Sequence, residues 1–336
     1  MSTVPMVALG DGLITSALGF GCMSLSGTYG PADDEESEHV LDAAIDAGVR
    51  LIDTADVYGA GHNELLVGRT VRRRHHEVEL ATKFGFAPPG SVDERRFIGD
   101  PEYVATAARA SLGRLGVDHI DLYYYHRLDP TVPIEDTIGA MAELVRQGLV
   151  RHLGVSEVTG DELRRAHAVH PIAAVQSEWS LISRDVEVQV IPTARELGVG
   201  FVAYAPLGRG LLANADVDIP DDDLRRAFPR FDDDALPTNQ GLARTVAELA
   251  ARLSVTPSQL ALAWVRERAR ELAIPVTPIP GTRRIDRLGE NLASLTVEIP
   301  PTVRANLDAL AERSRGDRAR DVSAISQGRE RVGGRP

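Results

Sequence analysis

Short runs of apolar residues, rich in valine, isoleucine and tyrosine, alternate along the chain with longer stretches of helical periodicity. The short runs are typical of buried strands and the longer stretches of amphipathic helices. Strands separated by helices indicate a parallel sheet, and eight such units can close it into a barrel. The pattern therefore predicts an α/β fold, a (β/α)8 TIM barrel. Its strands are expected at residues 17–22, 50–55, 78–84, 119–126, 152–156, 173–178, 200–205 and 274–280.

Glycines mark the ends of several predicted helices. The stretches EESEHVLDAAIDAG, PEYVATAARASLGRLG, IEDTIGAMAELVRQG and TARELG all finish in glycine, the usual residue beyond a helix C-terminus. Ahead of the first strand, MVALGDGLITS alternates around Gly10, Asp11 and Gly12 and predicts a β-hairpin. We expect this N-terminal hairpin to cap the barrel floor.

Two segments break the alternation. Residues 214–240 make a connection longer than a normal strand–helix loop, which indicates a lid or a cofactor clasp. Its aspartates lack the spacing of a calcium loop, which favours a solvated acidic loop. Beyond Arg313 the chain is polar and arginine-rich, and we expect it to fray. One barrel domain is thus predicted over residues 1–315, followed by a tail at 316–336.

The composition argues against several classes of partner and of cellular location. The net charge of −12 argues against a nucleic-acid partner, because binding to phosphate backbones requires clustered positive charge. The sequence shows no signal-peptide pattern and no apolar run long enough to span a membrane. Cys22 is the only cysteine, so no internal disulfide can form. We therefore expect a cytoplasmic protein without a membrane partner, acting on a small molecule.

Polar residues gather at the predicted C-terminal ends of the strands, where barrels of this type place their active sites. Asp53 and Tyr58 follow the second strand, Lys83 the third, and His126 closes the fourth. Among 37 lysines and arginines, Lys83 is the only lysine. An ammonium group, unlike a guanidinium, is compact and can lose its proton when buried. An acid, a cation, a phenol and an imidazole on one rim form a proton-transfer set.

Two chemistries fit that set. A desolvated Lys83 can attack a carbonyl and form a Schiff base, as a lyase does. Alternatively, a charged Lys83 paired with Asp53 lowers the pKa of Tyr58, whose phenol then protonates a carbonyl oxygen while hydride reaches the carbon. The second chemistry needs a nicotinamide cofactor.

Two segments favour such a cofactor, although no G-x-G-x-x-G motif follows a strand. After the eighth strand, PIPGTRRIDRLGEN combines a glycine turn with arginines 283, 284 and 287 ahead of a helix. Backbone amides at a helix N-terminus and arginine forks bind phosphate. After the seventh strand, AYAPLGRG places the ring of Tyr204, which can stack on a nicotinamide, beside two glycines. The arginines favour NADPH over NADH because they can neutralise a 2′-phosphate.

The motifs LGFGCMSLSGTYGP, LIDTADVYGAGHNELLVGR, LATKFG, RLGVDHIDLYYYHRLDP, VRHLGVSEV, AVQSEWSL, AYAPLGRGLL and PIPGTRRIDRLGENL follow one another along the chain. Together they resemble the aldo-keto reductase family, in particular its bacterial and plant branch. The resemblance implies a barrel that binds NADPH and reduces aldehydes or ketones to alcohols. It also implies that Tyr58 is the general acid, that Lys83 and His126 assist its proton transfer, and that Asp53 pairs with Lys83.

The resemblance further implies the cofactor contacts. Ser156 and Gln176 match the positions that hold the carboxamide, and Tyr204 matches the residue that stacks on the nicotinamide. Segments 207–210 and 281–287 match those that hold the pyrophosphate and the 2′-phosphate. The implied set is Gly21, Cys22, Met23, Asp53, Ser156, Gln176, Tyr204, Pro206, Leu207, Gly208, Arg209, Gly210, Ile279, Gly281, Thr282, Arg283, Arg287, Glu290 and Asn291. No metal site is expected.

Three positions depart from the family pattern. Glu157 stands where many relatives have Asn, and Tyr125 and Trp179 replace residues that are often Gln and Tyr. Aromatic candidates for the substrate pocket are Tyr29, Phe86 and Trp179, while the substrate itself stays open among aldehydes, ketones, sugars and pyridoxal-type aldehydes. Since some family members are channel-associated modules, a cofactor-sensing regulatory subunit is an alternative of another class.

Overall fold

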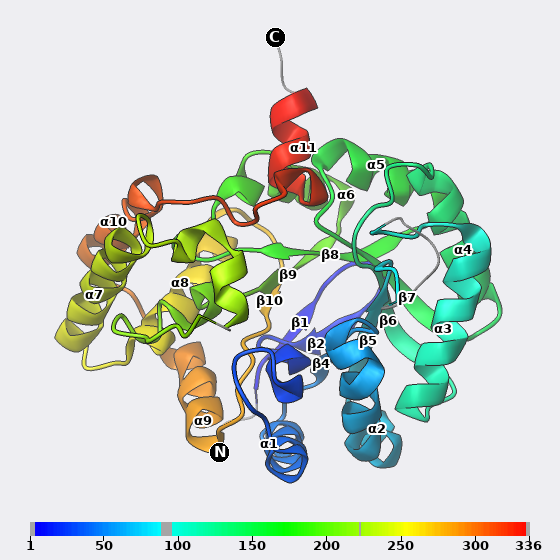
Figure 1. The fold of residues 1–336 in the computed structure, drawn as a ribbon, viewed down its shortest axis with the longest axis horizontal. Coiled ribbons are helices and arrows are strands. Elements are labelled where there is room, and N and C mark those ends of the chain that lie inside the picture. Colours follow the sequence, from blue (N-terminus) through cyan, green and yellow to red (C-terminus); the bar gives the residue numbers. More distant parts are fainter. Residues whose placement is uncertain (1–3, 89–95, 222, 334–336) are drawn as a thin grey trace.

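The computed structural model describes residues 4–88, 96–221 and 223–333. At its centre lies an eight-stranded sheet in the order β10-β9-β8-β7-β6-β5-β4-β3, in which neighbouring strands run parallel and helices lie outside (Figure 1). Backbone hydrogen bonds from Gly19 N to Pro278 O (2.9 Å) and from Gly21 N to Pro280 O (3.5 Å) join its two edges. The sheet therefore closes, which confirms the predicted (β/α)8 barrel. The strands are β3 (Phe20–Gly21), β4 (Leu51–Asp53), β5 (Glu79–Phe84), β6 (Ile120–Tyr125), β7 (Val150–Ser156), β8 (Ile172–Glu178), β9 (Gly200–Tyr204) and β10 (Val276–Pro278).

The helices begin and end at residues with clear local reasons. Asp33 caps the first helix by accepting a hydrogen bond from the Glu36 amide, and Thr159 forms a capping box with Glu162. Gly116 ends another helix with a φ of 70°, a left-handed conformation that favours glycine, as the sequence predicts. The helices are α1 (Asp34–Asp46), α2 (His62–Arg74), α3 (Pro101–Leu115), α4 (Ile134–Arg146), α5 (Gly160–Val169), α6 (Val190–Leu197), α7 (Leu236–Arg252), α8 (Pro257–Glu271), α9 (Ile285–Ala293), α10 (Pro301–Asp308) and α11 (Ser326–Gly333).

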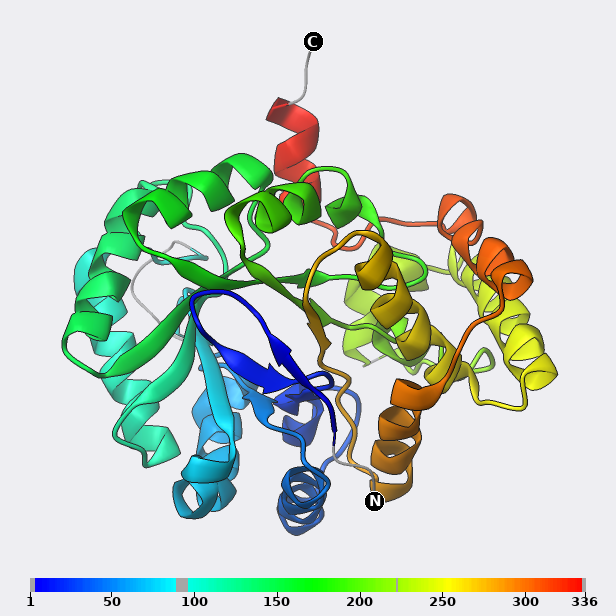
Figure 2. The same cartoon turned by 180° about the vertical axis from the view of Figure 1, so that it is seen from behind.

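The predicted hairpin consists of β1 (Met6–Ala8) and β2 (Ile14–Ser16), paired antiparallel. Asp11 and Gly12 at its tip both have positive φ, the geometry of a two-residue hairpin turn. Leu9 and Leu13 pack among residues that line the barrel interior, and Gly10 N donates to Ala173 O near the start of β8 (2.8 Å). Figure 2 shows the hairpin lying across this end of the barrel. The hairpin therefore closes the floor, and the opposite rim carries the strand C-termini.

Because Leu13 is only 2% exposed in this floor, Leu13→Ala is expected to lower the free energy of unfolding by about 2–5 kcal/mol. The loss comes from the removed apolar contacts and the cavity left behind. Urea denaturation followed by circular dichroism measures it. The matched control is Leu65→Ala on the surface of α2, where the side chain is 51% exposed and a change within about 0.5 kcal/mol is expected. Equal effects of the two substitutions would show that the hairpin does not contribute to the core.

The long connection after β9 contains some regular structure. The sequence predicts a loop up to residue 240, but helix α7 already begins at Leu236. The connection ahead of α7 includes two 3-10 turns, Leu224–Ala227 and Pro229–Phe231, in which Arg230 and Phe231 are buried. Burial of these residues ties the connection to the barrel.

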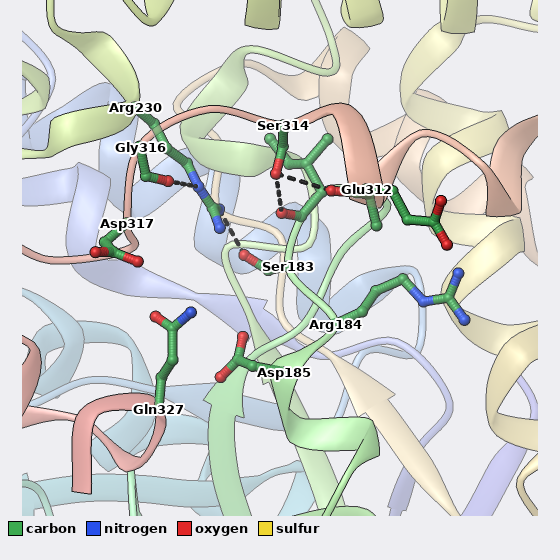
Figure 3. Close-up of a pocket in the computed structure, with 11 residues that line it drawn as sticks. Ser183, Arg184, Asp185, Arg230, Glu312, Ser314, Gly316, Asp317 and Gln327 are labelled. Carbon is green, nitrogen blue, oxygen red and sulfur yellow. Dashed lines mark hydrogen bonds between the residues drawn. The ribbon is translucent and has the colours of Figure 1, made fainter. Parts of the chain in front are cut away.

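The C-terminal tail does not fray as the sequence predicts. It runs from α10 back to the barrel rim, where Arg318 is only 3% exposed, and it ends in α11. A cavity of about 500 Å³ lies between the tail and the connection from β8 to α6 (Figure 3). The prediction fails because the carboxylates that bind the tail arginines lie far away in sequence, so no local pattern reveals them. The division into residues 1–315 and a tail stays a prediction, and residues 334–336 lie outside the described residues.

Candidate active site

Four titratable side chains meet at the C-terminal ends of neighbouring strands. Asp53 ends β4, Lys83 lies near the end of β5, and His126 directly follows β6. Tyr58 begins a short 3-10 helix (Tyr58–Gly61) after β4. Because β4, β5 and β6 are parallel neighbours, these positions share one rim. The structure thus brings together the four residues that the sequence analysis selected.

Lys83 is at the centre of this group and is fully buried. Its Nζ donates to Asp53 Oδ1 (2.5 Å) and to Thr54 O (2.7 Å), and lies 3.5 Å from the hydroxyl oxygen of Tyr58. Asp53 accepts a further hydrogen bond on Oδ2 from Gln176 Nε2 at 2.8 Å. All three protons of the ammonium group therefore have acceptors, and one of them faces the phenol.

The protonation states follow from burial and this pairing. Burial by itself would lower the pKa of Lys83, but the Asp53 carboxylate and the Tyr58 hydroxyl together outweigh it, and the pKa lies above its ordinary value. Burial raises the pKa of Tyr58, which the Lys83 ammonium opposes without cancelling. Lys83 thus lowers the pKa of Tyr58, as predicted, but desolvation of the phenolate is the larger effect, so the pKa stays above its ordinary value. At neutral pH the pair is an ammonium ion beside a neutral phenol.

His126 lies beside the phenol. Its ring is edge-on to that of Tyr58, with 6.0 Å between the centroids, and edge-on to Phe86 at 4.9 Å. Burial first, and then the charges of Arg127 and Lys83, lower the pKa of His126 well below its usual value, so the imidazole is neutral. Its Nδ1 atom is buried and has no hydrogen-bond partner in the described part of the chain. A neutral imidazole with an unpaired ring nitrogen therefore lies beside the phenol.

Ser156 ends β7 next to this group and is buried. Its Oγ accepts a hydrogen bond from Arg127 Nη1 at 3.2 Å, and the same nitrogen donates to His126 O at 2.6 Å. The sequence analysis missed Arg127. Its position directly after His126, at a predicted strand end, was the available signal.

The segment after β9 turns sharply. Ala205, Gly208, Arg209 and Gly210 all have positive φ, and the amides of Gly208 and Gly210 donate within the turn, to Ala205 O at 2.9 Å and to Leu207 O at 3.1 Å. The ring of Tyr204, at the end of β9, is partly exposed beside them. A flat, partly exposed ring at this rim can stack on a nicotinamide.

The long connection between β9 and α7 reaches across the barrel mouth to the opposite loop. Arg209 donates through Nη1 to the Tyr29 hydroxyl (3.2 Å) and stacks on Phe228 at 3.8 Å from the ring centroid. Arg225 also lies over the Tyr29 ring, at 5.7 Å. Arg209 Nη2 lies 3.6 Å from Glu178 Oε2 at the end of β8. These contacts tie the connection to the rest of the barrel, so it is not a freely solvated loop.

The arginines after β10 are engaged within the chain. Arg283 donates to the carbonyl oxygens of Tyr29 (3.0 Å), Gly30 (2.9 Å) and Pro31. Arg284 pairs with Asp286 and Arg287 with Glu290, and both of these guanidinium groups are at least half exposed. Arg287, with 2.5 Å to its partner, can still turn toward a phosphate at the start of α9.

The remaining predicted cofactor residues lie around the same rim. Gly21 and Gly281 approach so closely that a Cβ on Gly281 would lie 2.4 Å from Gly21 O, so a side chain cannot be added there. Cys22 is fully buried. The set comprises Gly21, Cys22 and Met23 at β3, Pro206 and Leu207 after β9, Ile279, Gly281 and Thr282 after β10, and Glu290 and Asn291 in α9.

One of the three aromatic residues predicted for the substrate pocket lies away from the mouth of the barrel. Tyr29 and Phe86 lie at the mouth, beside Arg209 and His126 respectively. Trp179, in contrast, is fully buried between the sheet and the helices, edge-on to Trp264 of α8. Its indole Nε1 donates to Glu187 at 3.0 Å. The prediction was wrong because Trp179 lies one residue beyond the end of β8 and turns outward.

Asp56, two residues before the phenol, gives the site a pH dependence. Burial, reinforced by Glu64, raises the pKa of Asp56 to about 7, and its Oδ1 atom has no hydrogen-bond partner in the described ranges. A carboxyl whose folded-state pKa is raised loses stabilising free energy as pH rises from its unfolded value toward 7. Asp56→Asn is therefore expected to be more stable than the wild type at pH 8, with the difference vanishing near pH 4. Chemical denaturation across this range measures it, and a difference independent of pH would contradict the assignment.

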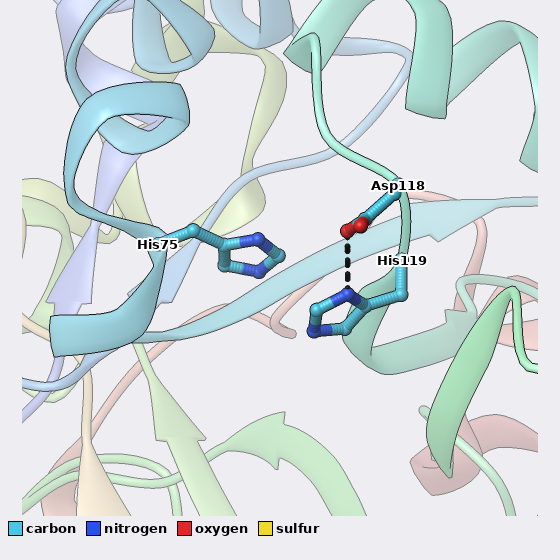
Figure 4. A group of neighbouring side chains, drawn as sticks. All are labelled: His75, Asp118 and His119. Atoms are coloured by element: carbon cyan, nitrogen blue, oxygen red, sulfur yellow. Dashed lines mark hydrogen bonds and ion pairs between the residues drawn. The ribbon is translucent and has the colours of Figure 1, made fainter.

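A second cluster lies at the barrel floor, where His75, Asp118 and His119 offer possible metal ligands within 4.8 Å of one another (Figure 4). The two imidazole rings are stacked, with 4.4 Å between centroids and 24° between planes. A ring nitrogen binds a metal in its own ring plane, so one ion cannot serve both rings in this arrangement. The buried Asp121 carboxylate lies 2.8 Å from His75 Nε2 and 3.4 Å from His119 Nε2. We interpret the cluster as an ion-pair network around Asp121.

No helix within residues 4–88, 96–221 and 223–333 is long and apolar enough to cross a bilayer.

A model of the Aldo/keto reductase family matches residues 17–312 of the chain, which include every strand of the barrel and all four rim residues. The chain belongs to the aldo/keto reductase family. The predicted resemblance is thereby confirmed. A curated relative of this reductase, probable aldo-keto reductase 1 of Glycine max, is 45% identical over 293 residues, which is 86% of this chain and 83% of the relative.

Solved structures agree with this reductase in fold. The glycerol dehydrogenase AKR11B4 from Gluconobacter oxydans has a TM-score of 0.81 and 28% identity, over 93% of this chain and 97% of that one. A thermostable aldo-keto reductase, Tm1743, solved in complex with the inhibitor epalrestat, has a TM-score of 0.71 and 29% identity, over 91% and 99%. Family membership makes this protein an oxidoreductase that reduces carbonyl compounds, in a family that generally uses a nicotinamide cofactor.

Proposed function

We propose that this reductase converts aldehydes or ketones to alcohols with NADPH, and that Tyr58 is its general acid. The observation that carries the proposal is the contact of the Lys83 ammonium with the Tyr58 hydroxyl at 3.5 Å, beside the buried side chains of Asp53 and His126. When bound, the cofactor supplies the hydride. The polypeptide supplies the proton and the surroundings in which a carbonyl oxygen can accept it.

The protein's own groups account for the proton transfer. The Tyr58 hydroxyl is protonated at neutral pH and is the donor to the substrate oxygen. As that proton leaves, negative charge develops on the phenol oxygen, and the Lys83 ammonium next to it stabilises this charge. Asp53 and Thr54 O hold the ammonium in place. The neutral His126, edge-on to the phenol, offers a hydrogen-bonding nitrogen to the same substrate oxygen.

The Schiff-base lyase is disfavoured by the same contacts. A lysine nucleophile must be unprotonated and able to reach a carbonyl. Lys83 is fully buried, donates to two oxygen acceptors, and has a raised pKa. Reduction with borohydride in the presence of an aldehyde is expected to leave Lys83 unmodified.

The preference for NADPH rests on the arginines after β10. Arg287→Met is expected to raise the KM for NADPH by about tenfold or more, because a charge-assisted contact to the 2′-phosphate is lost. The KM for NADH, which lacks that phosphate, is expected to stay unchanged and is the internal control. Steady-state kinetics with a panel of aldehydes measures both constants. Equal KM values of the wild type for the two cofactors would overturn the preference.

The nicotinamide proposal itself is tested more simply. Purified protein is expected to change NADPH fluorescence on binding and to consume NADPH with at least one aldehyde or ketone of the panel. A protein that does neither is not an NADPH-dependent reductase. Tight NADPH binding without turnover would instead favour the regulatory subunit.

A further inference from the structure

Glu157 directs its carboxylate toward the C-terminal tail. It follows Ser156 at the end of β7, is fully buried, and has a φ of 54°, a left-handed conformation that is uncommon outside glycine. This turn aims the side chain at Arg318. The carboxylate accepts from Arg318 Nη1 at 2.9 Å on one oxygen and from Nη2 at 3.0 Å on the other. Such a two-point contact fixes both groups in one orientation.

The same carboxylate also holds Tyr204. The Tyr204 hydroxyl donates to Glu157 Oε1 at 2.7 Å, which is the oxygen that receives Arg318 Nη1. A continuous path of hydrogen bonds therefore leads from the tail, through Glu157, to the ring that we assign to nicotinamide stacking. The backbone amide of Glu178, at the end of β8, donates to this oxygen as well, at 3.1 Å.

The tail depends on polar contacts for its attachment. Arg318 Nη2 also donates to Asp185 at 2.8 Å, and Ser326 donates to Glu157 Oε2 through its amide (3.3 Å) and its hydroxyl (3.2 Å). Next to these contacts lies the cavity of Figure 3, across which the tail residue Gln327 faces the connection from β8. Arg329 also holds the tail, since it donates to the Glu162 carboxylate and to Glu157 O. Among these polar groups beside the cavity, Arg318 is the guanidinium that pairs with the Glu157 carboxylate.

Loss of that cation would leave a buried carboxylate unpaired, which is costly. Burial by itself would raise the pKa of Glu157, but Arg318, together with Arg127 and the Tyr204 hydroxyl, outweighs it and holds the pKa well below its ordinary range. Without Arg318 the carboxylate must take up water or a proton, and in either case its contact with Tyr204 is disturbed. The orientation of Tyr204 therefore depends on whether the tail is docked.

We propose that Arg318 is a positioning residue which, through Glu157, orients Tyr204, so that docking of the tail and binding of the cofactor stabilise each other. The inference rests on the proposed role of Tyr204 at the nicotinamide. It assigns a function to the position where Glu replaces the Asn of many relatives: the acid here binds the tail. Because coupling between two binding events is reciprocal, the cofactor is expected to tighten the tail as much as the tail tightens the cofactor.

The first experiment measures the effect on the cofactor. Arg318→Met removes the charge and keeps much of the bulk, and is expected to raise the Kd and KM for NADPH by about tenfold or more while kcat falls less than threefold. Arg318→Lys keeps the positive charge but loses the two-point contact of the guanidinium. Its Kd and KM for NADPH are expected to lie between those of the wild type and those of Arg318→Met. The matched control is Arg315→Met, which removes an exposed guanidinium three residues away and is expected to leave the Kd unchanged.

The second experiment tests whether the effect of Arg318 on NADPH binding passes through Glu157. The double variant Arg318→Met with Glu157→Gln has no unpaired charge at position 157, and its amide oxygen can still accept from Tyr204. Its Kd for NADPH is expected to return to within about threefold of the wild type. A double variant as weak as Arg318→Met alone would show that the effect does not pass through Glu157.

The third experiment needs no variant. In wild-type protein, saturating NADPH is expected to slow hydrogen–deuterium exchange in α11, which begins at Ser326. Arg318→Met is expected to abolish this protection. Unchanged exchange, or an unchanged Kd in Arg318→Met, overturns the coupling and leaves the proposed function standing. A wild-type protein that does not bind NADPH at all overturns the proposed function, and with it this inference.

Discussion

Tyr58→Phe is expected to reduce the rate of carbonyl reduction by about 10²–10⁴-fold, the usual contribution of a positioned general acid. The substitution removes one oxygen atom, the one that lies 3.5 Å from Lys83 Nζ. The ring keeps its edge-on contact with His126, so the fold and the affinity for NADPH are expected to persist. NADPH consumption at saturating aldehyde measures the rate, and fluorescence titration measures the affinity.

The control for this variant is Tyr103→Phe. Tyr103 lies on α3, and its hydroxyl donates to Phe86 O at 3.3 Å, so the same atom is removed near the site but outside the proton path. Its rate is expected to change less than threefold. Full activity of Tyr58→Phe, or an equal loss in both variants, would remove the general acid from Tyr58.

Lys83→Met is expected to lower the free energy of unfolding by about 3–5 kcal/mol and to reduce kcat by at least 10²-fold. The loss of stability arises because the buried Asp53 carboxylate, which now receives the ammonium at 2.5 Å, is left without its cation. The loss of rate arises because no charge stabilises the developing phenolate. Urea denaturation and steady-state kinetics separate the two effects.

A second substitution distinguishes structure from catalysis. Lys83→Met combined with Asp53→Asn removes the unpaired charge, so much of the stability is expected to return while the activity stays low. Lys83→Arg keeps a charge but places a larger, planar group in a site with no exposed surface, and it is also expected to reduce carbonyls poorly. If Lys83→Arg retained near wild-type activity, the compact ammonium would have no special role.

The barrel and its proton-transfer group were predictable because their signals are local. Each strand is a short apolar run, and the barrel rule places whatever follows it on a single rim. Asp53, Lys83 and His126 stand at such strand ends, so three neighbouring strands bring them together without any knowledge of packing. Even the hairpin at the floor is visible in the sequence, through Asp11 and Gly12 at its tip.

The features that sequence reasoning missed depend on contacts over long separations. Arg318 looks like part of a solvated tail, since its partner Glu157 is 161 residues away. Trp179 looks like a rim residue, since only the packed helices show that its ring turns outward toward Trp264. The lowering of the Tyr58 pKa by Lys83 could be predicted from the sequence, whereas the larger effect of burial, which raises that pKa, could not.

The burial of Lys83, the only lysine of the chain, has a practical consequence for chemical labelling of this protein. Since the only lysine of the chain is fully buried, amine-directed labels and cross-linkers find no lysine side chain on the folded surface. Modification of Lys83 by such a reagent requires that the barrel rim open. The rate of that modification is therefore a direct chemical reporter of local unfolding around the active site, readable by mass spectrometry at a single residue.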